Sequence, residues 1–132
     1  QTALNAYLDQ LSPAAGSRVL ALFDWLAVAH AKPDFRGCPF TNAAAELPDP
    51  QHPARAVIAA YKLWMRDTLD DLAAADGLPA TTPWGSALML LIDGANARVV
   101  TTGDRTAILD ARRTAEALIG TAAPHHPDEE TP

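Results

Sequence analysis

The sequence predicts an all-α fold, a bundle of five to six helices, and three observations lead to that prediction. Alanine and leucine, which are strong helix formers, dominate long segments of the chain. Apolar residues recur at helical spacing rather than in the alternating runs that are typical of strands. Prolines and glycines fall mostly between these segments and separate them. The 132 residues are enough for one domain with a substantial core.

Helices are expected at about 2–11, 13–31, 39–47, 54–75, 83–103 and 105–119. Ser12 with Pro13, and Thr82 with Pro83, each have the pattern of an N-cap followed by proline in the first helical turn. The prolines at 48, 50 and 53 make the segment 48–53 a tight loop between the third and fourth helices.

The ends of the later helices are also marked. Gly77 is expected to end the fourth helix, Asp104 to cap the sixth, and Gly120 to stop it. Beyond that glycine, residues 121–132 are rich in proline, histidine and acidic residues, and they predict a disordered tail. The folded domain is therefore expected to span 1–120.

Charge and cysteine content exclude several functional classes. The net charge of −6 lacks the basic stripe that DNA phosphates require, so this part of the chain is not expected to bind nucleic acid itself. The longest apolar stretch, 87–100, contains Asp93 and Arg98 and is too short and too polar to span a membrane. A single cysteine, Cys38, fits a reducing compartment, so a cytoplasmic location is expected.

Four segments, in this order along the chain, carry a resemblance to a known family: FRGCPF at 35–40, NAAAE at 42–46, DPQHP at 49–53 and LLIDGA at 90–95. With the helix that follows the third segment, they cover more than half of the chain. They resemble the regulatory, C-terminal domain of TetR-family transcriptional regulators.

The resemblance implies a non-enzymatic sensor without metal or cofactor. It implies a helical bundle whose last two helices pair with their copies in a homodimer, and a cavity between the earlier helices and the fifth that binds a small, largely apolar effector. No segment resembles the family's helix-turn-helix module, so contact with DNA is expected only through a preceding N-terminal domain of the parent protein. Effector binding would then release a repressor from DNA.

Two sets of candidate residues follow from this reading. The ligand-binding candidates are large apolar side chains and one carboxylate: Phe23, Phe40, Tyr61, Trp64, Met65, Met89 and Asp93. The dimer-interface candidates are apolar or small residues of the last two helices: Leu88, Ile92, Ala95, Val99, Ile108, Ala111, Ala115 and Leu118. Plain core packing is the alternative for each aromatic and methionine residue among the ligand-binding candidates.

Some polar residues leave more than one interpretation open. Asp93, inside an apolar helix, could form a buried pair with an arginine of a neighbouring helix, anchor an effector, or act as a catalytic acid or base. Cys38, at a helix start, could be an inert buried thiol or a reactive one. The four histidines lack metal-ligand spacing. Arg66 and Asp70, four residues apart, are expected to pair on a solvated helix face.

Two further functions remain open: a small all-helical enzyme with a hydrophobic substrate, and a dimerisation module without a ligand. For the sensor, the short third helix is the expected moving part, because it lies between the Gly37 corner and the proline-rich loop. An effector would shift it relative to the fourth helix and favour the state that does not bind DNA.

Overall fold

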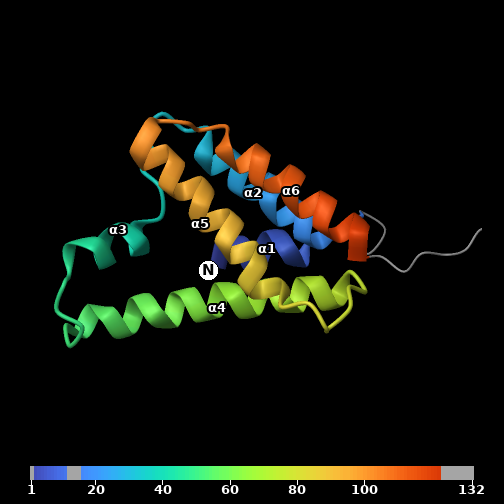
Figure 1. Cartoon of the computed structure of the whole chain (residues 1–132), viewed down its shortest axis with the longest axis horizontal. Helices are drawn as coiled ribbons and strands as arrows, with labels where there is room; N and C mark the ends of the chain where they lie inside the picture. The colour runs from blue at the N-terminus through green and yellow to red at the C-terminus, as the bar shows by residue number, and fades with distance from the viewer. Residues whose placement is uncertain (1, 12–15, 123–132) are drawn as a thin grey trace, which may run out of the picture.

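The computed structural model describes residues 2–11 and 16–122, and within them it forms six α-helices and no strand (Figure 1). The all-α class is confirmed, and each expected helix has a counterpart. In chain order they are α1 (Thr2–Asp9), α2 (Arg18–His30), α3 (Pro39–Glu46), α4 (Pro53–Ala75), α5 (Trp84–Thr102) and α6 (Ala107–Ala122).

The long helix α5 is the centre of the arrangement. It packs on α4 along one side and on α6 along the other, while α2 lies against both α6 and α4. Figure 1 shows α2 and α6 running side by side, with α5 crossing between that pair and α4. The short helix α3 lies apart from this body, packs on α4, and buries none of its residues.

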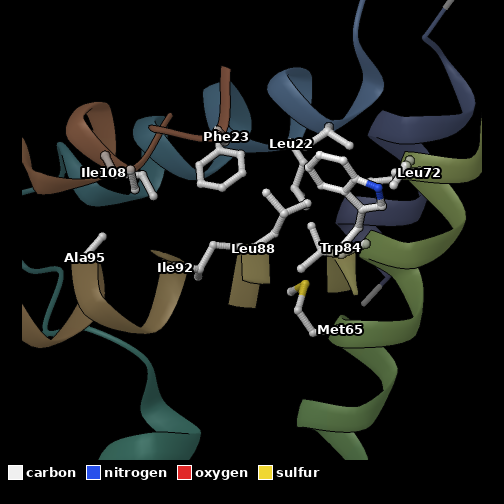
Figure 2. Close-up of a cluster of buried hydrophobic side chains, with 14 of the residues drawn as sticks. Leu22, Phe23, Met65, Leu72, Trp84, Leu88, Ile92, Ala95 and Ile108 are labelled. Carbon is white, nitrogen blue, oxygen red and sulfur yellow. The ribbon is translucent and has the colours of Figure 1, made fainter. Parts of the chain in front are cut away.

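The core lies where α2, α4, α5 and α6 meet. Figure 2 shows Leu22 and Phe23 of α2 facing Leu88 and Ile92 of α5, with Ile108 of α6 beside them. All five side chains are almost completely buried. Burying a side chain of this size stabilises the fold by about 1.5–3 kcal/mol, so this layer of contacts is a main source of stability.

One carboxylate of α4 and one directly after its end cap the N-termini of other helices. Asp76 accepts hydrogen bonds from the backbone N–H groups of Arg18 (2.8 Å) and Val19 (3.0 Å), at the start of α2. Asp70 accepts a bond of 2.7 Å from the N–H of Gly85, at the start of α5. Each carboxylate satisfies N–H groups that a helix leaves unpaired in its first turn. These caps tie α4 to its two neighbours.

These caps correct three predictions. α2 begins at Arg18 with Ser17 as its N-cap, not at residue 13, and the expected cap at residues 12 and 13 lies outside the described residues. Thr82 makes no side-chain cap for α5, whose first turn depends on Asp70 instead. Arg66 pairs with Asp67 and not with Asp70, because Asp70 serves α5.

The helix ends agree with the sequence at two points and differ at a third. Gly77 ends α4 with φ +75°, and its N–H and that of Leu78 donate back to the carbonyls of residues 74 and 73. Asp104 accepts from the N–H of Thr106 at the start of α6, as expected. Gly120 does not stop α6, which continues to Ala122. The first two residues of the predicted tail, 121 and 122, are therefore helical, and 123–132 lie outside the described residues.

Candidate functional site

A cavity of about 190 Å³ lies between α2, α4, α5 and the corner that precedes α3. Its walls are mostly apolar, and they come from segments far apart in the sequence. The lining residues are Trp25, Leu26, Ala29 and His30 of α2, Phe35, Gly37, Cys38 and Pro39 of the corner and the start of α3, Tyr61, Lys62 and Met65 of α4, and Met89, Ile92, Asp93 and Asn96 of α5.

His30 is the most unusual group in the cavity. Only 1% of its surface is exposed, and its Nδ1 atom has no hydrogen-bond partner among the described residues. Burial lowers the pKa of His30 below its ordinary value of 6.5, and the nearby Asn96 side chain opposes that shift only in part. Its ring packs on Phe35 with centroids 4.3 Å apart. A neutral imidazole therefore forms part of the cavity wall, with its Nδ1 atom enclosed by protein.

The corner that carries Phe35 is fixed by Arg105, just before α6. The Arg105 guanidinium donates to the carbonyl oxygens of Lys32 (2.7 Å), Pro33 (2.7 Å) and Phe35 (3.1 Å). Gly37 has φ +78°, and a Cβ there would lie 2.9 Å from the side chain of Val100. The left-handed backbone and this close approach to α5 explain why glycine occupies the position.

Tyr61 forms an aromatic wall of the cavity. Its ring stacks on Phe40 of α3, with centroids 3.8 Å apart and planes 9° apart, and Trp64 packs on it at 5.7 Å. Burial raises the pKa of the Tyr61 hydroxyl, and the nearby Cys38 and Asp93 raise it further. The phenol is therefore neutral at physiological pH, and α3 is joined to the cavity through the Phe40–Tyr61 stack.

An ion pair borders the cavity on the side of α4 and α5. Lys62 Nζ lies 2.6 Å from Asp93 Oδ1, and the two side chains are 26% and 41% exposed. Both residues, together with Met89, also line an open groove of about 660 Å³ on the outer side of α3, α4 and α5. These three residues therefore form the partition between the outer groove and the inner cavity.

The arrangement matches a solved structure closely. A TetR-family transcriptional regulator from Streptomyces coelicolor superimposes on 92% of this chain with a TM-score of 0.76 and 29% sequence identity. The chain has the fold of the C-terminal domain of a TetR-family regulator. It spans 59% of the length of that regulator. No family model and no curated protein sequence matches the chain.

Within this TetR-like domain, four of the seven predicted ligand-binding residues line the cavity: Tyr61, Met65, Met89 and Asp93. Phe23 does not; it is fully buried in the core between α2, α5 and α6 (Figure 2). Phe40 and Trp64 line neither the cavity nor the outer groove, and both rings pack on the ring of Tyr61. Asp93 pairs with a lysine rather than the expected arginine, and it is only half-buried.

The part of the cavity wall that α2 and the corner before α3 contribute was not predicted from the sequence. His30, Trp25 and Phe35 were not among the candidates, although they provide the buried imidazole and two aromatic faces. A signal existed for His30, because it continues the apolar stripe of α2 one turn beyond Leu26. A polar residue at such a position needs a partner or a ligand.

The predicted dimer interface also needs correction at the level of residues. Seven of its eight members are buried inside the chain's own core, and only Leu118 is exposed: the seven are Leu88, Ile92, Ala95, Val99, Ile108, Ala111 and Ala115. Most of them therefore offer little surface to a second copy, although Ala95 and Ala111 line a shallow groove between α5 and α6. The exposed apolar residues of α5 and α6 are instead Leu90, Val100, Leu109 and Leu118, with Leu90 72% exposed.

Two further findings concern the described residues only. In 2–11 and 16–122, no three His, Cys, Asp or Glu side chains gather where they could hold a metal ion. None of the six helices is both long and apolar enough to cross a membrane.

Proposed function

We propose that the chain is the effector-sensing and dimerisation domain of a TetR-family transcriptional regulator. The observation that carries this proposal is the cavity: an apolar space with a few polar groups, between α2, α4 and α5 of a TetR-like domain. Ligand sites are typically concave and mostly apolar with a small number of placed polar groups. The polar groups on the cavity wall are the side chains of His30, Tyr61 and Asn96 and the Lys62–Asp93 pair.

The effector would act through α3 and α4. Both helices reach the cavity, α3 through Phe40 on Tyr61 and α4 through Tyr61 and Met65. Because α3 buries none of its residues, little packing opposes its displacement. A ligand that binds one position of these helices better than another shifts the population toward that position. In the parent protein, that shift would change the spacing of two DNA-binding domains and release a repressor.

Dimerisation is proposed through the outward faces of α5 and α6. Between these helices lies a shallow groove lined by Leu90, Leu91, Gly94, Ala95, Arg98, Ala107, Asp110, Ala111 and Thr114. Exposed apolar residues on both helices are a liability in water unless a partner covers them. An isologous contact between two copies would cover this surface.

The enzyme alternative has less support. General acid–base catalysis requires groups that face the substrate in suitable protonation states. Asp93 is the only carboxylate that lines the cavity, and Lys62 lies 2.6 Å from it in an ion pair. The alternative of a dimerisation module without a ligand leaves the apolar cavity between α2, α4 and α5 without a role.

Ligand binding is tested by titrating the ¹⁵N-labelled chain with toluene and recording amide chemical shifts. Shifts should concentrate at residues of the cavity wall, such as Ile92 and Asn96. Ala29→Leu adds three carbon atoms to the cavity wall and should abolish them, whereas Val57→Leu, at an exposed position of α4, should leave them unchanged. Shifts that survive Ala29→Leu, or no shifts at all, would refute the site.

Dimerisation is tested by sedimentation velocity. Leu90→Glu places a charge on the proposed contact surface and should raise the dimer dissociation constant by at least tenfold, because a buried unpaired charge is costly. Val57→Glu, which changes an equally exposed apolar residue on α4, should leave it unchanged. A wild-type chain that is monomeric at 100 µM would contradict this part of the proposal.

A further inference from the structure

We propose that the ion pair between Lys62 and Asp93 is the gate through which a ligand enters the inner cavity from the outer groove. This inference rests on the proposed function, because it names the route to the effector site. Three observations support it: the residues that the two spaces share, the exposure of the ion pair, and the fixed structure of the opposite wall.

Three side chains separate the inner cavity from the outer groove. Lys62 of α4 and Met89 and Asp93 of α5 line both spaces, and no other described residue does. The contact of 2.6 Å between Lys62 Nζ and Asp93 Oδ1 therefore joins α4 to α5 across the boundary between the two spaces. A molecule in the outer groove reaches the cavity when these side chains move apart.

The three side chains can move apart without displacing a helix. Lysine has a flexible four-carbon stem, and methionine has three rotatable bonds. The side chains of Lys62 and Asp93 are 26% and 41% exposed, so both charges stay hydrated when the pair separates. Ion pairs with this exposure add little net stability. Opening the gate therefore requires rotation of side chains only, while α4 and α5 keep their positions.

The outer groove brings apolar molecules to this gate. Its lining includes Ile58, Leu63 and Leu90, of which Leu63 and Leu90 are 50% and 72% exposed. Exposed apolar side chains that surround a groove favour the transfer of apolar molecules from water. The groove has about 660 Å³ and the cavity about 190 Å³, so a wide apolar approach leads to a small site.

The opposite wall of the cavity is held by backbone contacts. A pocket of about 170 Å³ meets the cavity there, at Cys38 and Asn96. A Cβ on Gly37 would lie 3.0 Å from the carbonyl oxygen of Asn96 and 2.9 Å from the Val100 side chain, so the corner packs directly on α5. Arg105 fixes the same corner through three carbonyl oxygens. An entrance on this side would require movement of the loop backbone, which is slower than rotation of exposed side chains.

The test measures ligand exchange by ¹⁹F NMR with 4-fluorotoluene, a neutral apolar probe. Ala29→Leu should abolish the bound signal, which assigns that signal to the inner cavity. Lys62→Met removes the ion pair and keeps an unbranched side chain. The association and dissociation rate constants should both rise by about two- to fivefold, the range expected for a partly exposed ion pair, and the dissociation constant should change by less than about twofold. A parallel change of both rate constants is the signature of a gate.

Two matched variants serve as controls. Arg112→Met removes another ion pair between helices, with Asp24 at 2.7 Å and exposed fractions of 30% and 54%, and Arg112 lines neither the cavity nor the groove. Val100→Ala loosens the packing of the Gly37 corner on α5, at the opposite wall. Both variants should keep the rate constants of the wild type.

Salt provides a readout in the wild-type chain. A high concentration of NaCl screens a partly exposed ion pair, so it should speed exchange more in the wild type than in Lys62→Met. If Lys62→Met fails to fold, Asp93→Asn replaces it, because it weakens the same pair and keeps the shape of the side chain.

The outcomes separate this inference from the function on which it rests. Rate constants that stay unchanged in Lys62→Met, a change in only one of them, or faster exchange in Val100→Ala would overturn the gate and leave the effector site standing. An equal response of wild type and Lys62→Met to salt would do the same. If 4-fluorotoluene does not bind the folded wild-type chain, or its bound signal survives Ala29→Leu, both the gate and the effector site fail.

Discussion

The crossing of α4 and α5 gives a prediction in which two physical effects have opposite signs. Gly85 lies in the first turn of α5, and its N–H donates to Asp70 of α4 at 2.7 Å. A Cβ at this position would collide with the carbonyl oxygen of Arg66 and lie 2.6 Å from Asp70 Oδ2. Helix propensity alone predicts that Gly85→Ala stabilises the protein by up to about 1 kcal/mol.

The structure predicts the reverse. Overpacking against backbone costs about 1–3 kcal/mol, and separating the helices would weaken a charge-assisted hydrogen bond worth roughly 1.5–3 kcal/mol when fully protected. Asp70 is solvent-exposed, so only part of that second amount applies. After subtracting the propensity gain, the free energy of unfolding should fall by about 1–3 kcal/mol.

The assay is urea denaturation followed by circular dichroism at 222 nm. Gly120→Ala in α6 is the matched control, since nothing lies within 4 Å of a Cβ there, and it should be neutral or slightly stabilising. The m-value should stay unchanged in both variants. If Gly85→Ala is as stable as the wild type, the close approach of α4 and α5 in this account is incorrect.

Two further predictions concern stability. Asp76→Ala removes the cap of α2, and in urea denaturation it should lower the free energy of unfolding by about 2 kcal/mol. Asp71→Ala, at an exposed position of α4, is the control and should change this free energy by less than about 0.5 kcal/mol. The lowered pKa of His30 means that the unfolded chain binds this proton more tightly than the folded chain. Its effect on stability is therefore absent above the unfolded pKa of about 6.5 and becomes a loss as the pH falls below it. His30→Phe should remove this component, and parallel pH profiles for wild type and variant between pH 7.5 and 5 would contradict it.

The helices were predictable because the sequence marks their boundaries locally. The prolines before α3 and α4 and the glycine after α4 act within a few residues of the boundary they set. The caps of α2 and α5 were not predictable in this way. Asp76 and Asp70 are distant in sequence from the N-termini that they cap, so only the folded arrangement brings them there.

The candidate site could be predicted only in part for a similar reason. α5 carries apolar residues around much of its circumference, so periodicity alone does not separate the buried Leu88 and Ile92 from the exposed Leu90. Seven of the eight dimer candidates are therefore buried within the chain itself. Tyr61 and Met89 were correctly expected near a cavity, but the wall from α2 depends on the corner that Arg105 fixes, a contact across 70 or more residues.

A crystal structure of the chain under xenon pressure tests directly whether the cavity between α2, α4 and α5 admits an apolar ligand. Xenon enters apolar cavities of this size and is located by its strong electron density. A xenon atom is expected between α2, α4 and α5, in contact with residues of the cavity wall such as Phe35, Met65 and Ile92. Xenon found only in the outer groove beside Leu63 and Leu90, or none inside the domain, would contradict the claim that this cavity is an effector site.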